Sequence, residues 1–304
     1  MVNGREKTSG IYPYSFLHLW PVCMLYFASD NNSYKMKYAS LISFSFFCLA
    51  SHASSTEAVI KPYRYADLLL NEREVLPDPM DTSGLSSHIS DILQSYYINT
   101  FGGAESWQKI ESLLIKGKLL ATEGKSYEFV NYRKKPDLNK TVVYLENKHK
   151  VVTCFDGNDA WQFMTFESVA PESMPTDKSI DFIRDSWLGG HLLSPLLPGK
   201  TIEMLGRSKT IGGKLCKQIK VSLPNEQHYI ISLGAKHYQV AEETVSTVDG
   251  SKRYVEQSDF RRVSGIITPF RSKVYSDGLL IQEQVLESVE VNQGVMPWMF
   301  RRPQ

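Results

Sequence analysis

The chain has 304 residues, a formal net charge of +1, 42% hydrophobic residues and 22% charged residues. This composition is typical of a globular protein with one large or two small domains. Lysines and arginines mostly alternate with apolar residues, as on the solvated face of a sheet, and this pattern argues against a nucleic-acid-binding protein.

The first segment, residues 1–35, is apolar but interrupted by Pro13, His18 and Pro21. One interpretation is an upstream extension created by a mis-assigned start codon. The alternative is an uncleaved membrane anchor, which the prolines and the histidine disfavour. Neither interpretation places this segment in the fold.

A secretory signal peptide is predicted over residues 36–53. Lys37 follows Met36 as a short positive region, residues 41–50 form an apolar region, and cleavage is expected after Ala53. Cys48 lies inside the apolar region, so a lipoprotein anchor is not predicted. We therefore expect a secreted product that starts from Met36.

Residues 54–85 read as a leader or linker that ends in prolines and turn residues. The main domain is predicted over residues 86–304 and begins with a helix that Ser86 or Ser87 caps and that Gly102 and Gly103 terminate. A second short helical piece then leads into the first strand, where Ile115, Gly117 and Leu119 share one face.

Alternating segments separated by turn signals follow at short intervals and predict antiparallel strands. They stop at residues 166–200, which contain four prolines and a short helix predicted over residues 178–188. They resume after Lys200, with hairpin signals such as Asp277-Gly278. The predicted fold class is α+β and mostly antiparallel β.

Enzyme signatures are weak in this sequence. It contains no nucleophile elbow, phosphate-binding loop, paired-histidine zinc motif or Cys-x-x-Cys. Asp156 and Asp159 could in principle bind calcium or act as an acid/base pair, but turn chemistry already explains them. Glu242-Glu243 and Arg261-Arg262 read as solvated charges. We predict no catalytic residues, no metal site and no cofactor.

Cys154 and Cys216 are the two cysteines outside the N-terminal segments, and in an oxidising compartment they could form a disulfide. A pair of this kind is also ordinary background. The alternation around Cys216 places it on the polar side of its strand and places Leu215 on the inward side.

Several segments carry a family resemblance: "YYINTFGGAESWQKIESLLIKGKLL", "CFDGNDAWQF", "LLPGKTIEMLGRSKTIGGKLCKQIKVSL" and "SVEVNQGVMPWMF". Together they resemble bacterial outer-membrane lipoprotein-sorting-like proteins, which are related in fold to the LolA and LolB carriers and to the lipid-sensing domain of RseB. The resemblance covers roughly residues 86–303. It implies a strongly curved open sheet, or half-barrel, of about eleven or twelve strands with helices packed in the concave side.

The resemblance also implies a function: a periplasmic, non-enzymatic protein that binds a lipid or an acylated protein. An inner- or outer-membrane protein is an expected partner, and nucleic acid is not. Alternatives are an RseB-type sensing or interaction module and an enzyme acting on envelope lipids or glycans. The expected lid over a hydrophobic cavity is an apolar, proline-broken insert, and a plain core plug is the alternative. Its residues are Phe182, Ile183, Trp187, Leu188, Leu192, Leu193, Leu196 and Leu197.

Overall fold

We describe the fold from a computed structural model, in which residues 78–303 are described except 123, 225–226, 237 and 246–249. The predicted extension, the signal peptide and most of the leader lie outside the described residues. Among the described helices, none has both the length and the apolar character needed to cross a membrane.

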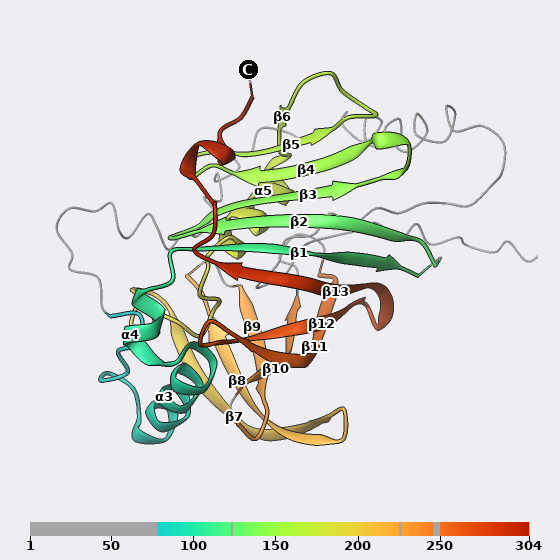
Figure 1. Cartoon of the computed structure of the whole chain (residues 1–304). Coiled ribbons are helices and arrows are strands. Elements are labelled where there is room, and N and C mark those ends of the chain that lie inside the picture. The colour runs from blue at the N-terminus through green and yellow to red at the C-terminus, as the bar shows by residue number, and fades with distance from the viewer. Residues whose placement is uncertain (1–77, 123, 225–226, 237, 246–249, 304) are drawn as a thin grey trace, which may run out of the picture. The chain divides into compact units, whose positions relative to one another are not determined.

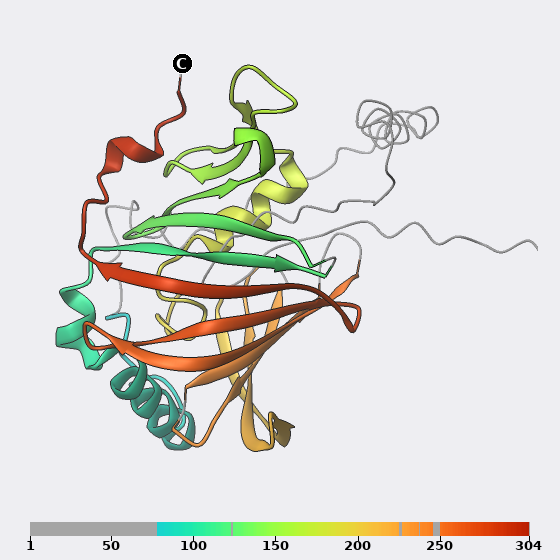
Figure 2. The same cartoon turned by 45° about the vertical axis from the view of Figure 1, so that its right-hand side comes forward.

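One antiparallel sheet of 13 strands forms the framework, and it is open and strongly curved (Figure 1 and Figure 2). The predicted fold class, a mostly antiparallel half-barrel, is confirmed. The strand order is β6-β5-β4-β3-β2-β1-β13-β12-β11-β10-β9-β8-β7. Two meanders therefore meet in the middle, where the first strand pairs with the last.

The first meander contains six strands that follow one another in the sheet. Alternation predicts five of them, and the two-residue β6 was not predicted because it is too short to show a period. Their bounds are β1 Ser112–Ala121, β2 Ser126–Lys134, β3 Leu138–Tyr144, β4 Lys150–Phe155, β5 Ala160–Met164 and β6 Glu172–Ser173. A 3-10 turn, η1 (Glu146–Lys148), joins β3 to β4.

The second meander contains the remaining seven strands, all of them predicted from the sequence. Asp277-Gly278 joins β12 to β13 as predicted, whereas the turn at Ser264-Gly265 between β11 and β12 was not predicted. The bounds are β7 Thr201–Ile211, β8 Lys214–Ser222, β9 His228–Leu233, β10 Gln239–Val245, β11 Lys252–Val263, β12 Ile266–Ser276 and β13 Leu279–Val291.

Helix α3 (Ser87–Phe101) precedes the sheet and turns sharply into α4 (Gly103–Gln108). Gly102 ends α3 in the left-handed conformation, with φ 75°, which a glycine adopts without strain. The apolar stripe of α3 is buried through Ile92, Leu93 and Tyr96. The Tyr97 hydroxyl donates a hydrogen bond of 2.7 Å to the Leu192 carbonyl, so α3 contacts the insert.

The insert, residues 174–200, connects the two outer edges of the sheet, β6 and β7. It contains helix α5 (Thr176–Asp185), which begins two residues earlier and ends three residues earlier than predicted. In both views α5 lies on the concave side of β1–β5, and the C-terminal 3-10 helix η2 (Pro297–Phe300) lies on the opposite face (Figure 1 and Figure 2).

Candidate functional site

The predicted lid residues lie in the interior of the fold. Trp187 and Leu196 are partly buried, and the other six are buried. Phe182 and Ile183 pack with Phe155, Ala160 and Met174, which places one side of α5 against β4 and β5. The role of these residues as a lid stays a prediction, since burial alone also fits a core plug.

Polar contacts hold the insert at defined points. The Arg133 guanidinium on β2 is buried, and its Nη2 atom donates to the carbonyls of Asp185, Ser186 and Trp187 at 3.1, 2.9 and 3.0 Å. These carbonyls lie at the C-terminal end of α5, where backbone acceptors lack helical partners. Arg133 therefore stabilises the end of the helix and fixes the position at which the irregular part of the insert begins.

The second half of the insert is fixed in the same way. Lys200 Nζ donates to the Leu193 carbonyl at 2.6 Å, and the Ser194 amide donates to the Pro79 carbonyl at 2.7 Å. Both contacts satisfy backbone groups of a proline-broken segment that forms no helix. The insert is thus a closed loop with specific anchors on the sheet, on α3 and on the segment before α3.

The other side of α5 carries a buried charged cluster that the sequence reasoning missed. Arg184 contacts Asp181 at 2.6 Å and Asp185 at 2.9 Å, and its guanidinium lies 5.5 Å from the centre of the Tyr229 ring. His191 of the insert stacks on Tyr229 with ring centres 3.9 Å apart. The cluster joins the insert, through α5 and His191, to β9.

Glu242 on β10 and Arg253 on β11 extend the cluster across the sheet. Burial raises the pKa of the Glu242 carboxyl well above its usual value, and the negative charge of Asp185 raises it further. The prediction that Glu242 is a solvated charge is wrong, because β10 is an inner strand and this position faces the concave side. Glu243 is partly buried, and Arg261 and Arg262 are exposed as predicted.

Burial favours the neutral forms of three further groups in this region, Asp185, Lys200 and His191. It raises the pKa of Asp185 to about 7, against the opposing charge of Arg184. It lowers the pKa of Lys200 to about 7. The pKa of His191 is lowered by burial and by the positive charges of Arg184 and Lys200.

The interior is therefore amphiphilic, and its buried polar and charged side chains go beyond the expected hydrophobic cavity. On β2 and β3, buried Asn131 donates to Asn139 and Thr141, and Asn139 donates to Ser186 of the insert at 3.1 Å. Hydrogen bonds of this kind are what a buried polar group requires. Acidic groups and a histidine converge here, buried between the insert and the sheet.

The acidic residues Asp156 and Asp159 form a turn. The Asp156 carboxylate accepts hydrogen bonds from the amides of Asn158 and Asp159 at 2.9 and 2.8 Å, which confirms the turn interpretation. Among the described residues, no group of histidine, cysteine and acidic side chains could hold a metal ion.

The possible disulfide is not present, because Cys154 and Cys216 are both free. Cys154 lies on β4 and Cys216 on β8, and these strands are far apart in the sheet order. Cys216 is fully buried and Leu215 is 68% exposed, so the predicted faces of this strand are reversed at its start. Cys216 packs instead with Ile211 and Ala241.

Comparisons with known proteins find similar solved structures but no sequence relative. No protein-family model matches it, and no curated protein matches its sequence. Its structure is similar to a LolA superfamily protein from Nitrosomonas europaea, with 11% identity and a TM-score of 0.48, covering 70% of this chain and 96% of that one.

It is also similar to a DUF1329 family protein from Desulfovibrio piger, with 11% identity, a TM-score of 0.47 and coverage of 65% and 92%. A third similar structure, from Vibrio parahaemolyticus, is described as an outer-membrane lipoprotein-sorting protein domain, with 9% identity, a TM-score of 0.43 and coverage of 63% and 88%. At these identities and TM-scores the likeness carries no argument about what the chain binds. The third of these structures carries the description of the lipoprotein-sorting-like proteins that the sequence resembles.

Proposed function

We propose that the chain is a non-enzymatic periplasmic protein that binds the acyl chain of a lipid or of a lipidated protein. The acyl chain would lie between the concave face of the sheet and the insert. The observation that carries this proposal is that residues 174–200 run from one outer edge of the sheet to the other and cover its concave side with buried apolar side chains. A covering segment at this place can act as a lid.

The energetics of an exchange between lid and ligand support the proposal. Leu192, Leu193 and Leu197 are buried, and moving each into water costs about 2 kcal/mol. A buried methylene contributes about 0.8 kcal/mol, so roughly eight methylenes offset the three leucines. An acyl chain of ordinary length could therefore replace the insert, whereas the empty protein would keep it closed.

The amphiphilic interior supports a ligand that has both an apolar and a polar part. The apolar concave residues Phe129 and Val143 lie on the same strands as the buried polar residues Asn131 and Thr141. Glu242 and Arg253 of the charged cluster lie on the sheet and would stay there when the insert moves, where they would offer an acceptor and donors to a head group. This arrangement would orient the ligand, while burial of the chain would supply the affinity.

The first test measures uptake of a fluorescent fatty acid by the full-length protein, together with native mass spectrometry and lipid extraction. Trp187 is partly buried in the insert, so its emission should change when the insert moves. Comparison with a Trp187→Phe variant shows how much of the change in emission comes from Trp187. Failure of the wild-type protein to take up the probe, with no co-purifying lipid, would reject the proposal in favour of a core plug.

A second test asks whether the insert must move. A Cβ atom added at Gly84 would lie 3.1 Å from a Leu196 methyl carbon, so Gly84→Cys and Leu196→Cys put thiols on two segments that are in contact, as a disulfide tether requires. We expect the oxidised double variant to lose uptake and the reduced form to regain it. The single Gly84→Cys variant is the matched control. Equal uptake in both redox states would show that the insert is not a lid.

A further inference from the structure

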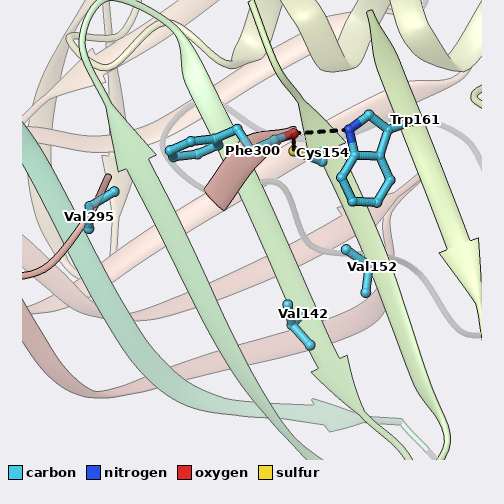
Figure 3. Packing of buried hydrophobic residues seen from close by; sticks show 6 residues of the cluster. All are labelled: Val142, Val152, Cys154, Trp161, Val295 and Phe300. Atoms are coloured by element: carbon cyan, nitrogen blue, oxygen red, sulfur yellow. Dashed lines mark hydrogen bonds between the residues drawn. The ribbon is translucent and has the colours of Figure 1, made fainter. Parts of the chain in front are cut away.

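The C-terminal segment, residues 295–302, forms a strap across the convex face of the first meander. Val295 and Phe300 are buried there against Val142, Val152 and Trp161 (Figure 3). This face is opposite to the one that α5 covers (Figure 2). The strap is therefore separate from the insert and from the charged cluster.

Hydrogen bonds fix the backbone of the strap. The Phe300 carbonyl accepts from Trp161 Nε1 at 3.1 Å and from Cys154 Sγ at 3.2 Å, both drawn in Figure 3. Lys140 Nζ donates to the Met299 carbonyl at 2.9 Å. With these anchors buried, the side chains that the strap presents outward are held in one arrangement.

Two large apolar side chains point outward between the anchors. Trp298 is 65% exposed and Met296 is 52% exposed, and Pro297 lies between them. A tryptophan is among the costliest apolar side chains to leave in water. The sheet thus holds in place a small apolar projection that the described part of the chain does not cover.

Positive charge follows directly after this projection. Arg301 and Arg302 are exposed, and residues 292–303 contain no acidic residue. Arg302 donates to the Ser173 hydroxyl at 3.2 Å and to the Pro171 carbonyl, both of them neutral acceptors. No carboxylate of the described residues lies within ion-pair distance of either arginine. The two charges are therefore available to an anionic partner.

We propose that the strap docks on the surface of an anionic lipid bilayer. Tryptophan with its apolar ring and polar N–H is suited to the head-group region, and arginine side chains beside it would bind lipid phosphates. A stable protein interface buries about 800 Å² on each side, more than two exposed side chains provide. A bilayer requires only that Trp298 and Met296 enter the head-group region.

This docking would use a face of the sheet that is separate from the proposed acyl site. Binding should depend on anionic lipid, since each arginine near such a surface contributes about five-fold in affinity. Loss of the Trp298 ring should weaken binding by about ten-fold. Salt should weaken the electrostatic part, because exposed charges are screened.

The experiment is flotation of the full-length protein with two kinds of vesicle, pure phosphatidylcholine and an equal mixture of phosphatidylcholine and phosphatidylglycerol. We expect binding to the mixed vesicles, about ten-fold weaker for Trp298→Ser and reduced by more than ten-fold when Arg301→Gln and Arg302→Gln are combined. Matched controls are Leu279→Ser, at a 61% exposed side chain at the start of β13, the end of that strand away from the strap, and Lys214→Gln on β8, far from the strap in the sheet order.

A second readout locates the contact. In the Trp187→Phe background, brominated phosphatidylglycerol should quench Trp298, and Trp298→Ser should remove this quenching. Equal flotation of Trp298→Ser and wild type would overturn the proposal, as would equal binding to both kinds of vesicle. A dimer mass in light scattering that Trp298→Ser reduces to a monomer mass would also overturn it, because the strap would then bind a second copy of the chain.

Discussion

Lys200 provides a test of how the insert is held, because its pKa couples stability to pH. Its ammonium is buried at the end of the insert and donates to the Leu193 carbonyl. Burial lowers the pKa of Lys200 from 10.5 to about 7. The folded protein therefore binds fewer protons than the unfolded chain between these two values, and folding becomes more favourable as pH rises through that window.

The size of this pH effect follows from the difference in the number of protons bound by the folded and unfolded states. Each pH unit within the window changes the free energy of unfolding by about 1.4 kcal/mol, and the group is only half deprotonated at pH 7. Lys200 should therefore add about 2 kcal/mol of stability between pH 7 and pH 9. The contribution is complete above the unfolded pKa of 10.5 and is lost as pH falls through 7.

The assay is urea unfolding at several pH values for the wild-type protein, Lys200→Met and the control Lys214→Met, which changes an exposed lysine. Subtracting the Lys200→Met curve from the wild-type curve cancels the other titrating groups, including Asp185. A difference that rises by about 2 kcal/mol confirms the buried lysine. A flat difference, equal to that of the control, would refute the reasoning.

Two further predictions concern packing. Gly117→Ala should lower the free energy of unfolding by about 1–3 kcal/mol, because the added Cβ would lie 2.3 Å from the Val285 carbonyl oxygen of β13, and urea unfolding measures the loss. An unchanged midpoint would show that β1 and β13 can separate locally. Phe300→Ala should cost about 3–5 kcal/mol and should expose the Cys154 thiol to a thiol reagent, whereas Met296→Ala, at an exposed position, should do neither.

The local elements of the fold were largely predictable. Twelve of the 13 strands were predicted from the sequence, and signals such as Gly102 and Asp277-Gly278 mark the ends of a helix and a hairpin. These features depend on the conformations that a few neighbouring residues allow. The two-residue β6 has no period to detect, and its position depends on pairing with β5.

The charged cluster was not predictable in the same way. Glu242 and Glu243 are adjacent in the sequence, so one of them lies on each face of the strand. Such a pair is typical of a solvated edge strand. The burial of Glu242 follows from two long-range facts: β10 is an inner strand, and Arg184 of α5 reaches the same side of the sheet. Leu215 and Cys216 show the same limit, since the ends of a strand lie where local alternation no longer determines which face is covered.

The pairing of β1 with β13 determines what happens when the chain is cut within the insert. Nine residue pairs join these strands at the centre of the sheet, whereas the insert joins only the outer edges. A protease cut within the insert would therefore produce two fragments that remain associated through a continuous ladder of backbone hydrogen bonds. Each meander is also incomplete until its partner is synthesised, so assembly of the central ladder must wait for the last strand of the chain.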